Sequence, residues 1–196
     1  MREATTYRKT NETEVRAWVK IDGSGKSSIK VPIGFLKHMI EAFSKHSLID
    51  IDIEAQGDLE VDQHHTVEDI ALVLGETLRK ALGDKRGIER AGFFLYPMDD
   101  ALAQVAVDLS GRPYLQFDVE FRRRFCGDFD SDLTEHFFEA LANSLGANIA
   151  IRLLSGKNDH HKLEAIFKAF AKAMKQACQK DKRIGEEIPS TKGVIS

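Results

Sequence analysis

Two His-His pairs, each followed by a glutamate, are the residues of this sequence best suited to chemistry. His64-His65-x-x-Glu68 and His160-His161-x-x-Glu164 share one spacing. Seven histidines in 196 residues give only about 0.25 adjacent pairs by chance, so two pairs are more than composition predicts. Each pair opens a segment of helical periodicity, in which residues three and four apart share a face. This arrangement is typical of metal ligands.

Imidazole and carboxylate groups together suit divalent Zn, Mn, Fe, Co or Ni, whereas structural zinc fingers use thiolates. Successive helical residues project about 100° apart, so His64 and His65 are not expected to bind one ion together. We therefore expect two ions, each with open positions that favour catalysis. The expected ligands form two sets of three histidines and one glutamate: His38, His64, His65, His136, His160, His161, Glu68 and Glu164.

An internal repeat supports this assignment. The block His38–Phe43 has the same pattern as His136–Leu141, 98 positions later, and the two His-His pairs are 96 positions apart. We infer duplication of a roughly 96-residue unit with a two-residue indel, since self-similarity at a fixed offset indicates a repeated structural unit. The prediction is one domain of two halves, residues 1–92 and 93–196.

The elements that position these residues are predicted from hydrophobic periodicity. Apolar residues that alternate or run together predict strands over residues 14–22, 49–53, 101–109 and 115–121. Helical spacing predicts long helices through residues 70–81 and 166–177. The expected fold class is therefore α+β, each half a mainly antiparallel sheet with helices on one face.

Composition excludes several classes of protein. Lys+Arg 28 against Asp+Glu 31 gives a net charge of −3, so the uniform positive field that non-specific nucleic-acid binding needs is absent. No apolar stretch is long enough for a membrane span, and the first residues lack a signal-peptide pattern. Cys126 and Cys178 form no Cys-x-x-Cys motif. We expect a soluble cytoplasmic protein with neither nucleic-acid nor membrane partners.

Taken with their flanks, the histidine blocks resemble the imidazoleglycerol-phosphate dehydratase family. The resemblance covers nearly the whole chain, with matching stretches at residues 8–13, 22–25, 34–39, 64–69, 108–114, 135–138, 158–170 and 188–193. It implies dehydration of D-erythro-imidazole glycerol phosphate to imidazole acetol phosphate in histidine biosynthesis. It also implies two Mn²⁺ ions per active site, with other divalent ions possible. The implied assembly is a homo-oligomer of 24 subunits with shared sites, each half folded like the second domain of ribosomal protein S5.

The resemblance also implies roles for individual residues. Glu12, Glu68 and Glu164 are the candidate catalytic carboxylates; similarity points to Glu12 for proton transfer, with metal-bound water or a ligand glutamate as alternatives. The substrate phosphate is expected to bind Arg90, Arg112, Lys168, Ser190 and Lys192, which supply cations and hydrogen-bond donors. Three positions depart from the family pattern: Lys37 and Gln63 where aspartate is usual, and Ala42 where glutamine is frequent. These changes alter the surroundings of the first metal.

Two other functions use a similar ligand set. A binuclear hydrolase with metal-bound hydroxide would release inorganic phosphate from phosphate esters. A non-enzymatic metal-buffering protein needs the histidines and glutamates but has no use for Arg112 or Lys192.

Overall fold

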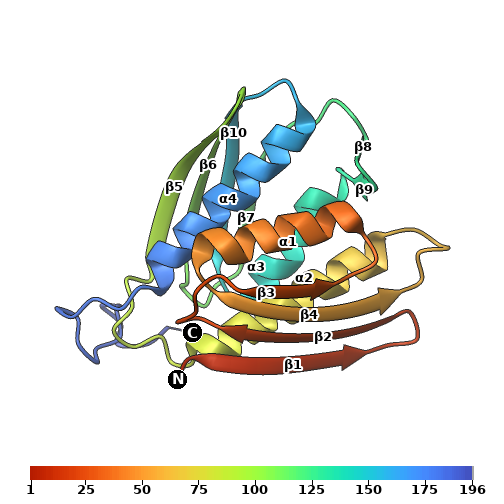
Figure 1. The fold of residues 1–196 in the computed structure, drawn as a ribbon. Coiled ribbons are helices and arrows are strands. Elements are labelled where there is room, and N and C mark those ends of the chain that lie inside the picture. Colours follow the sequence, from red (N-terminus) through yellow and green to blue (C-terminus); the bar gives the residue numbers. More distant parts are fainter. Residues whose placement is uncertain (196) are drawn as a thin grey trace.

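The computed structural model describes residues 1–195, and its first half forms a four-stranded sheet covered by two helices (Figure 1). The elements in chain order are β1 (Glu3–Lys9), β2 (Thr13–Lys20), β3 (Ser27–Lys30), α1 (Gly34–Ser47), β4 (Asp50–Gly57) and α2 (His64–Leu82). The strand order is β1-β2-β4-β3. Only the β3–β4 pair is parallel, because the crossover through α1 returns the chain in the same direction.

The second half repeats this topology. Its elements are β5 (Ala91–Met98), β6 (Ala101–Asp108), β7 (Tyr114–Asp118), β8 (Phe125–Cys126), β9 (Phe129–Asp130), α3 (Leu133–Leu145), β10 (Asn148–Ser155) and α4 (Asp159–Cys178). The strand order β5-β6-β10-β7, with β7 and β10 parallel, matches that of the first sheet. The α+β fold and the internal duplication are thereby confirmed.

The halves differ by more than a two-residue indel. His38 and His136 are 98 positions apart, but β1 and β5 begin at Glu3 and Ala91, an offset of only 88. The difference arises between the third strand and the following helix. Residues 31–33 make this connection in the first half, whereas residues 119–132, including β8 and β9, make it in the second. The expectation of a near-perfect repeat is therefore wrong at this connection.

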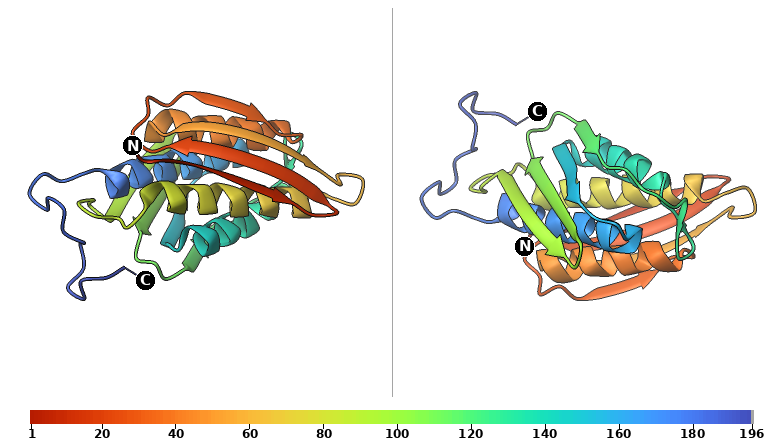
Figure 2. Two further views of the ribbon diagram at one scale, coloured as in Figure 1. Left: turned by 90° about the horizontal axis from the view of Figure 1, so that it is seen from below. Right: turned by 90° about the horizontal axis from the view of Figure 1, so that it is seen from above.

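The four helices form one layer between the two sheets, as the two views of Figure 2 show from opposite sides. Alternation in β2 buries Val15, Ala17 and Val19 against the helices. Between the halves, Phe43 of α1 stacks on Phe170 of α4 with ring centroids 5.1 Å apart. Each helix thus buries one side on its own sheet and another on the opposite half, so both halves share one hydrophobic core.

All four helices begin at the same end of the molecule, beside β8 and β9 (Figure 1). In each half the crossover helix and the last helix both run antiparallel to the parallel strands, which places their first turns together. The histidines of both repeated motifs lie within the first two turns of these helices. The chain after α4 extends from the opposite end of the helix layer (Figure 2).

The outer faces of the two sheets differ in character. On the first sheet the outward residues of β2 and β4 are mostly charged, among them Glu14, Arg16, Asp52 and Glu54. On the second sheet large apolar side chains face outward: Phe93 is 65% exposed, Leu95 49%, Tyr114 61% and Leu154 47%. These apolar residues stand on the two edge strands and at the end of β10, and exposed Gln104, Gln116 and Arg152 lie between them, so this face is mixed in character.

Both cysteines are buried and unpaired. Complete burial raises the pKa of the Cys178 thiol to about 12, so it stays protonated. Within residues 1–195, none of the helices combines the length and apolar character that a membrane span requires.

Candidate metal centre and active site

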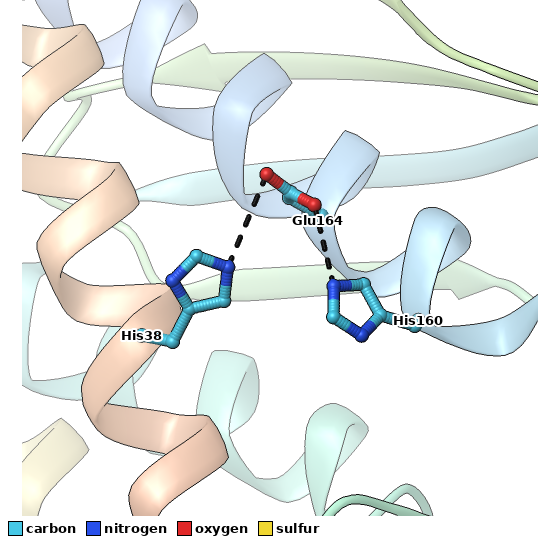
Figure 3. Close-up of side chains that lie close together, drawn as sticks. All are labelled: His38, His160 and Glu164. Carbon is cyan, nitrogen blue, oxygen red and sulfur yellow. Dashed lines mark ion pairs between the residues drawn. The ribbon is translucent and has the colours of Figure 1, made fainter.

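The tightest group of possible metal ligands joins the two halves of the chain. His38 lies in the second turn of α1, and His160 and Glu164 lie one turn apart at the start of α4. Glu164 Oε1 is 4.0 Å from His38 Nε2, and Glu164 Oε2 is 3.5 Å from His160 Nε2. Figure 3 shows the carboxylate between the two imidazole rings. We call these three residues the α1–α4 cluster.

Glu164 is held in its ionised form. Burial, the largest single influence, raises the pKa of this carboxyl, but Lys168, whose Nζ is 2.7 Å from Glu164 Oε1, acts together with His38 and His160 to hold the pKa below its usual range. Lys168 is itself largely buried. The cluster therefore presents a carboxylate and two imidazoles.

The donor set of the α1–α4 cluster fits a divalent ion. One possible ligand atom from each of the three residues lies within 4.8 Å of the other two. Two bonds of about 2.1 Å to one ion place their donor atoms at most about 4.2 Å apart. The distance from His38 to one Glu164 oxygen and the distance from His160 to the other are both below this limit. Imidazole with carboxylate is a set that first-row divalent ions accept.

A second cluster stands at the corresponding place in the other helix pair. His64 and Glu68 lie at the start of α2, with His64 Nε2 3.7 Å from Glu68 Oε2. His136 of α3 approaches with its ring centroid 5.1 Å from that of His64. In this α2–α3 cluster, α2 takes the place of α4 and α3 that of α1. The duplication therefore produces two related clusters of two histidines and one glutamate.

The second histidine of each pair faces away from its cluster. His65 Nδ1 lies 3.0 Å from Asp58 Oδ2, and His161 Nδ1 lies 2.7 Å from Asp100 Oδ1. These hydrogen bonds are the main cause of a raised pKa for both imidazoles. The expected sets of three histidines and one glutamate are therefore not assembled within one chain. Sequence reasoning missed Asp58 and Asp100, which lie outside the repeated motifs and have no fixed spacing from the histidines.

Glu12 lies beside one of these outward histidines. Its Oε2 atom is 3.8 Å from His65 Nδ1, and Glu12, Asp58 and His65 form a second group with ligand atoms within 4.8 Å. The turn that carries Glu12 is attached to α2 through Asp69, which accepts hydrogen bonds from Arg8 and Thr13. Asp69 is buried, so it acts as a link between elements and not as a solvated carboxylate.

Four of the expected phosphate ligands lie at the opposite end of the subunit. Arg90 donates its backbone N–H to Ala177 O near the end of α4, about 25 Å along the helix from His160 at 1.5 Å per residue. Its guanidinium pairs with Asp108 at 2.7 and 3.0 Å and reaches Pro189 O, next to Ser190. Arg112 follows Gly111, which is hydrogen-bonded to Gly146 after the end of α3. The four residues at this end are Arg90, Arg112, Ser190 and Lys192; Lys168 lies beside Glu164 instead.

The three departures from the family pattern have different surroundings. Lys37 points toward Glu41, with 3.9 Å between Nζ and Oε1. Ala42 is buried in α1. Gln63, just before α2, donates to Asp128 O and accepts from Asp130 N at 3.1 Å. Gln63 is thus tied to the segment that contains β8 and β9.

His65 and His161 are expected metal ligands from the repeated motif, and on that expectation their raised pKa values predict a pH dependence of metal binding. Metal binding needs neutral imidazole and releases protons, and a raised pKa keeps the ring protonated to higher pH. As the pH is lowered, metal affinity should therefore begin to fall at a higher pH than it would if these histidines had the ordinary pKa of the side chain. Asp100→Asn should move this onset to lower pH. Titration of Mn²⁺ affinity against pH tests this, and an identical profile for the variant would contradict it.

Comparison of the sequence with known proteins points to one family. The family model for imidazoleglycerol-phosphate dehydratase (IGPD) matches residues 31–174. The enzyme of Chlorobium phaeovibrioides is 54% identical over 194 residues, covering 99% of this chain and 96% of the relative. This chain belongs to the imidazoleglycerol-phosphate dehydratase family. A relative from Clostridium botulinum strain Okra is 49% identical over 98% of this chain and 97% of its own length.

Solved structures of the family share the fold. The crystal structure from Staphylococcus aureus has a TM-score of 0.83 at 38% identity, covering 91% of this chain and 99% of the other. The Pyrococcus furiosus structure has a TM-score of 0.83 at 39% identity, with coverage of 96% and 99%. Membership makes this chain a hydro-lyase of histidine biosynthesis in a metal-dependent family. The enzyme class implied by the family resemblance is confirmed.

Proposed function

We propose that this chain dehydrates D-erythro-imidazole glycerol phosphate to imidazole acetol phosphate at a site with two divalent ions, Mn²⁺ being the expected ion. The observation that carries the proposal is the pair of related clusters at the starts of packed helices. In the α1–α4 cluster the possible ligand atoms lie within 4.8 Å of one another, and in the α2–α3 cluster His64 lies 3.7 Å from Glu68 and beside His136. We further propose that the two halves form one domain, because they share one core. A cytoplasmic location fits two unpaired thiols.

Different residues are proposed to bind the metal ions and to exchange a proton with the substrate. The two clusters hold the ions through His38, His160 and Glu164, and through His64, His136 and Glu68. When bound, the ions supply Lewis acidity that lets the imidazole ring of the substrate carry negative charge. Glu12, more than half exposed at its turn, is placed to exchange a proton with a bound substrate.

The phosphate group is proposed to bind at the opposite end of the chain. Among the described residues, neither Arg112 nor Lys192 has a carboxylate within 4.0 Å, so their charges are available to an anion. Arg90 is oriented by its two bonds to Asp108. A guanidinium and an ammonium together suit a phosphate monoester.

Because these two ends lie about 25 Å apart along α4, one substrate cannot contact both in the same chain. We therefore propose a homo-oligomer, expected to contain 24 subunits, in which a neighbour supplies the phosphate ligands. The outward-facing His65 and His161 would complete the metal sites of other copies. The exposed apolar residues on the outer face of the second sheet, such as Phe93 and Tyr114, are candidates for contact between copies.

Turnover of metal-stripped protein tests the proposed reaction. Chelator-treated protein should not convert imidazole glycerol phosphate, and Mn²⁺ should restore conversion to imidazole acetol phosphate. Inorganic phosphate measured in the same samples separates the dehydratase from a binuclear hydrolase, which would release it. Absence of conversion after Mn²⁺ is added would reject the proposed function.

A further inference from the structure

The long connection between β7 and α3 touches the beginnings of all four helices. We define it as the bridging segment, residues 119–132, which includes β8 and β9. The first half has only residues 31–33 at the corresponding place. Because the first half has no equivalent of this insertion, the contacts that the insertion makes indicate its role in the folded chain. Figure 1 shows it beside the ends of the helices that carry the clusters.

Asp128 of the bridging segment binds the start of α1. Its carboxylate accepts the backbone N–H of Gly34 at 2.6 Å and that of Phe35 at 2.8 Å. The residue preceding α1, Ile33, has no side chain able to cap these donors. The first N–H groups of a helix need partners outside the helix. Asp128 therefore supplies from the second half a cap that α1 lacks locally.

Gln63 links the segment to the start of α2. Its amide donates to Asp128 O and accepts from Asp130 N at 3.1 Å. An ionised aspartate at this position could not make both bonds, since a carboxylate has no donor for the carbonyl. The residue that departs from the family pattern here is thus the one that joins α2 to β9.

Asp159 links the segment to the start of α4. One carboxylate oxygen accepts the backbone N–H groups of Arg122 and Arg123 at 2.9 and 2.8 Å. Lys162 stands 2.7 Å from the same carboxylate and donates to Glu120 O at 2.9 Å. The segment then runs directly into α3 at Leu133.

Aromatic side chains connect the bridging segment to the α1–α4 cluster. Phe129 of β9 is buried and stacks on Phe35, with ring centroids 6.3 Å apart. The Phe35 ring meets His160 edge-on at 5.0 Å and His38 at 6.2 Å. Asp128 and Phe129 thus act on the same residue, Phe35, from the backbone and from the side chain. A shift of β9 would move the surroundings of both histidines.

We propose that the bridging segment is a positioning element for both metal clusters, with Asp128 fixing the α1–α4 cluster and Gln63 fixing the α2–α3 cluster. Neither residue is a ligand; each acts on the helix that carries a ligand. The inference rests on the proposed function, because it requires that the clusters bind ions. Partners that orient metal ligands typically contribute 10–100-fold to metal affinity.

The test measures metal binding by the full-length protein without substrate. Calorimetric titration of the metal-free protein with Mn²⁺ should resolve two binding events. Asp128→Ala should weaken one event about tenfold, Gln63→Ala should weaken the other about tenfold, and the double variant should weaken both. Asp128→Asn, which retains one acceptor, should recover part of the loss.

Two matched controls come from the same chain. Asp132→Ala removes an exposed carboxylate of the same segment that makes no side-chain cap, and Gln116→Ala removes an exposed glutamine of β7. Both should bind Mn²⁺ like the unchanged protein. Visible spectra of the Co²⁺-loaded variants add a readout of coordination geometry, which should change for Asp128→Ala and Gln63→Ala only.

The outcomes separate the two proposals. If the unchanged protein binds no divalent ion, the proposed function fails and this inference fails with it. If the unchanged protein binds two ions, but Asp128→Ala and Gln63→Ala match their controls in affinity and Co²⁺ spectrum, the positioning role alone is overturned. If Asp128→Ala lowers the unfolding temperature of the metal-free protein severely, the comparison rests on Asp128→Asn and Gln63→Ala, whose normal binding would contradict the inference.

Discussion

Mixed oligomers of two inactive variants should regain activity. Glu164→Gln removes the carboxylate of the α1–α4 cluster. Loss of a residue that only orients a metal ligand lowers activity by up to about 100-fold, so loss of the ligand itself should lower turnover by more. Arg112→Ala removes a charge at the opposite end of the chain. When both variants are co-expressed and assemble at random, about one quarter of the sites should combine an intact cluster with an intact phosphate end from a neighbour. Turnover per site, measured against each variant alone, gives the recovered fraction.

The same experiment has a control within one cluster. Glu164→Gln mixed with His160→Ala should recover nothing, because both residues come from the same helix of the same copy. Activity of the first mixture no higher than the average of its parents would mean that each chain builds a complete site. That outcome contradicts subunit sharing and leaves the metal clusters intact as a proposal. A complete site within one chain would also be inconsistent with the distance of about 25 Å along α4 between the metal clusters and the phosphate residues.

Breaking the buried ion pair at the start of α4 should have the largest effect on stability. The side chains of Lys162 and Asp159 are only 4% and 2% exposed and lie 2.7 Å apart. Lys162→Met leaves a buried carboxylate without its counter-charge, which typically costs about 3–5 kcal/mol in the free energy of unfolding. The shift in thermal unfolding midpoint of the metal-free protein, followed by circular dichroism, measures this.

Lys80→Met is the matched control for that substitution. Lys80 pairs with Glu76 at 2.8 Å, also within one helix, but both side chains are well exposed. An exposed pair of this kind contributes about 0.5 kcal/mol or less. Equal unfolding midpoints for the two variants would contradict the prediction, because they would show that the buried Asp159 carboxylate is no less stable without Lys162.

Several elements could be predicted because their residues repeat a simple pattern. The strand predicted over residues 14–22 corresponds to β2, and the helices predicted through 70–81 and 166–177 correspond to α2 and α4. These elements bury one regular face, so apolar residues mark it. The duplication was also visible, since the ligand histidines repeat with the helices that carry them. In the structure the order of the strands is also the same in the two sheets.

Other features leave no such mark on the sequence. In β1 only Thr6 is buried, so no apolar alternation shows the strand. In β5 three consecutive large residues, Phe93 to Leu95, are all exposed and hide its alternation. The spacing of the histidine blocks does not reveal the bridging segment. In the second half both blocks lie after this segment, so their offset from the first-half blocks stays nearly constant. The pairing of His65 with Asp58 and of His161 with Asp100 depends on turns whose contacts only the folded chain defines.

The common starting end of the four helices also sets the electrostatic character of the site. Each helix carries a macrodipole whose positive end, about half an elementary charge, lies at its N-terminus. Four such ends favour an anionic substrate and oppose a bound cation. Retention of divalent ions must therefore depend on the carboxylates among them, above all Glu68 and Glu164. We expect ions that exchange readily with solvent and are released by mild chelation, unlike those of a closed structural site.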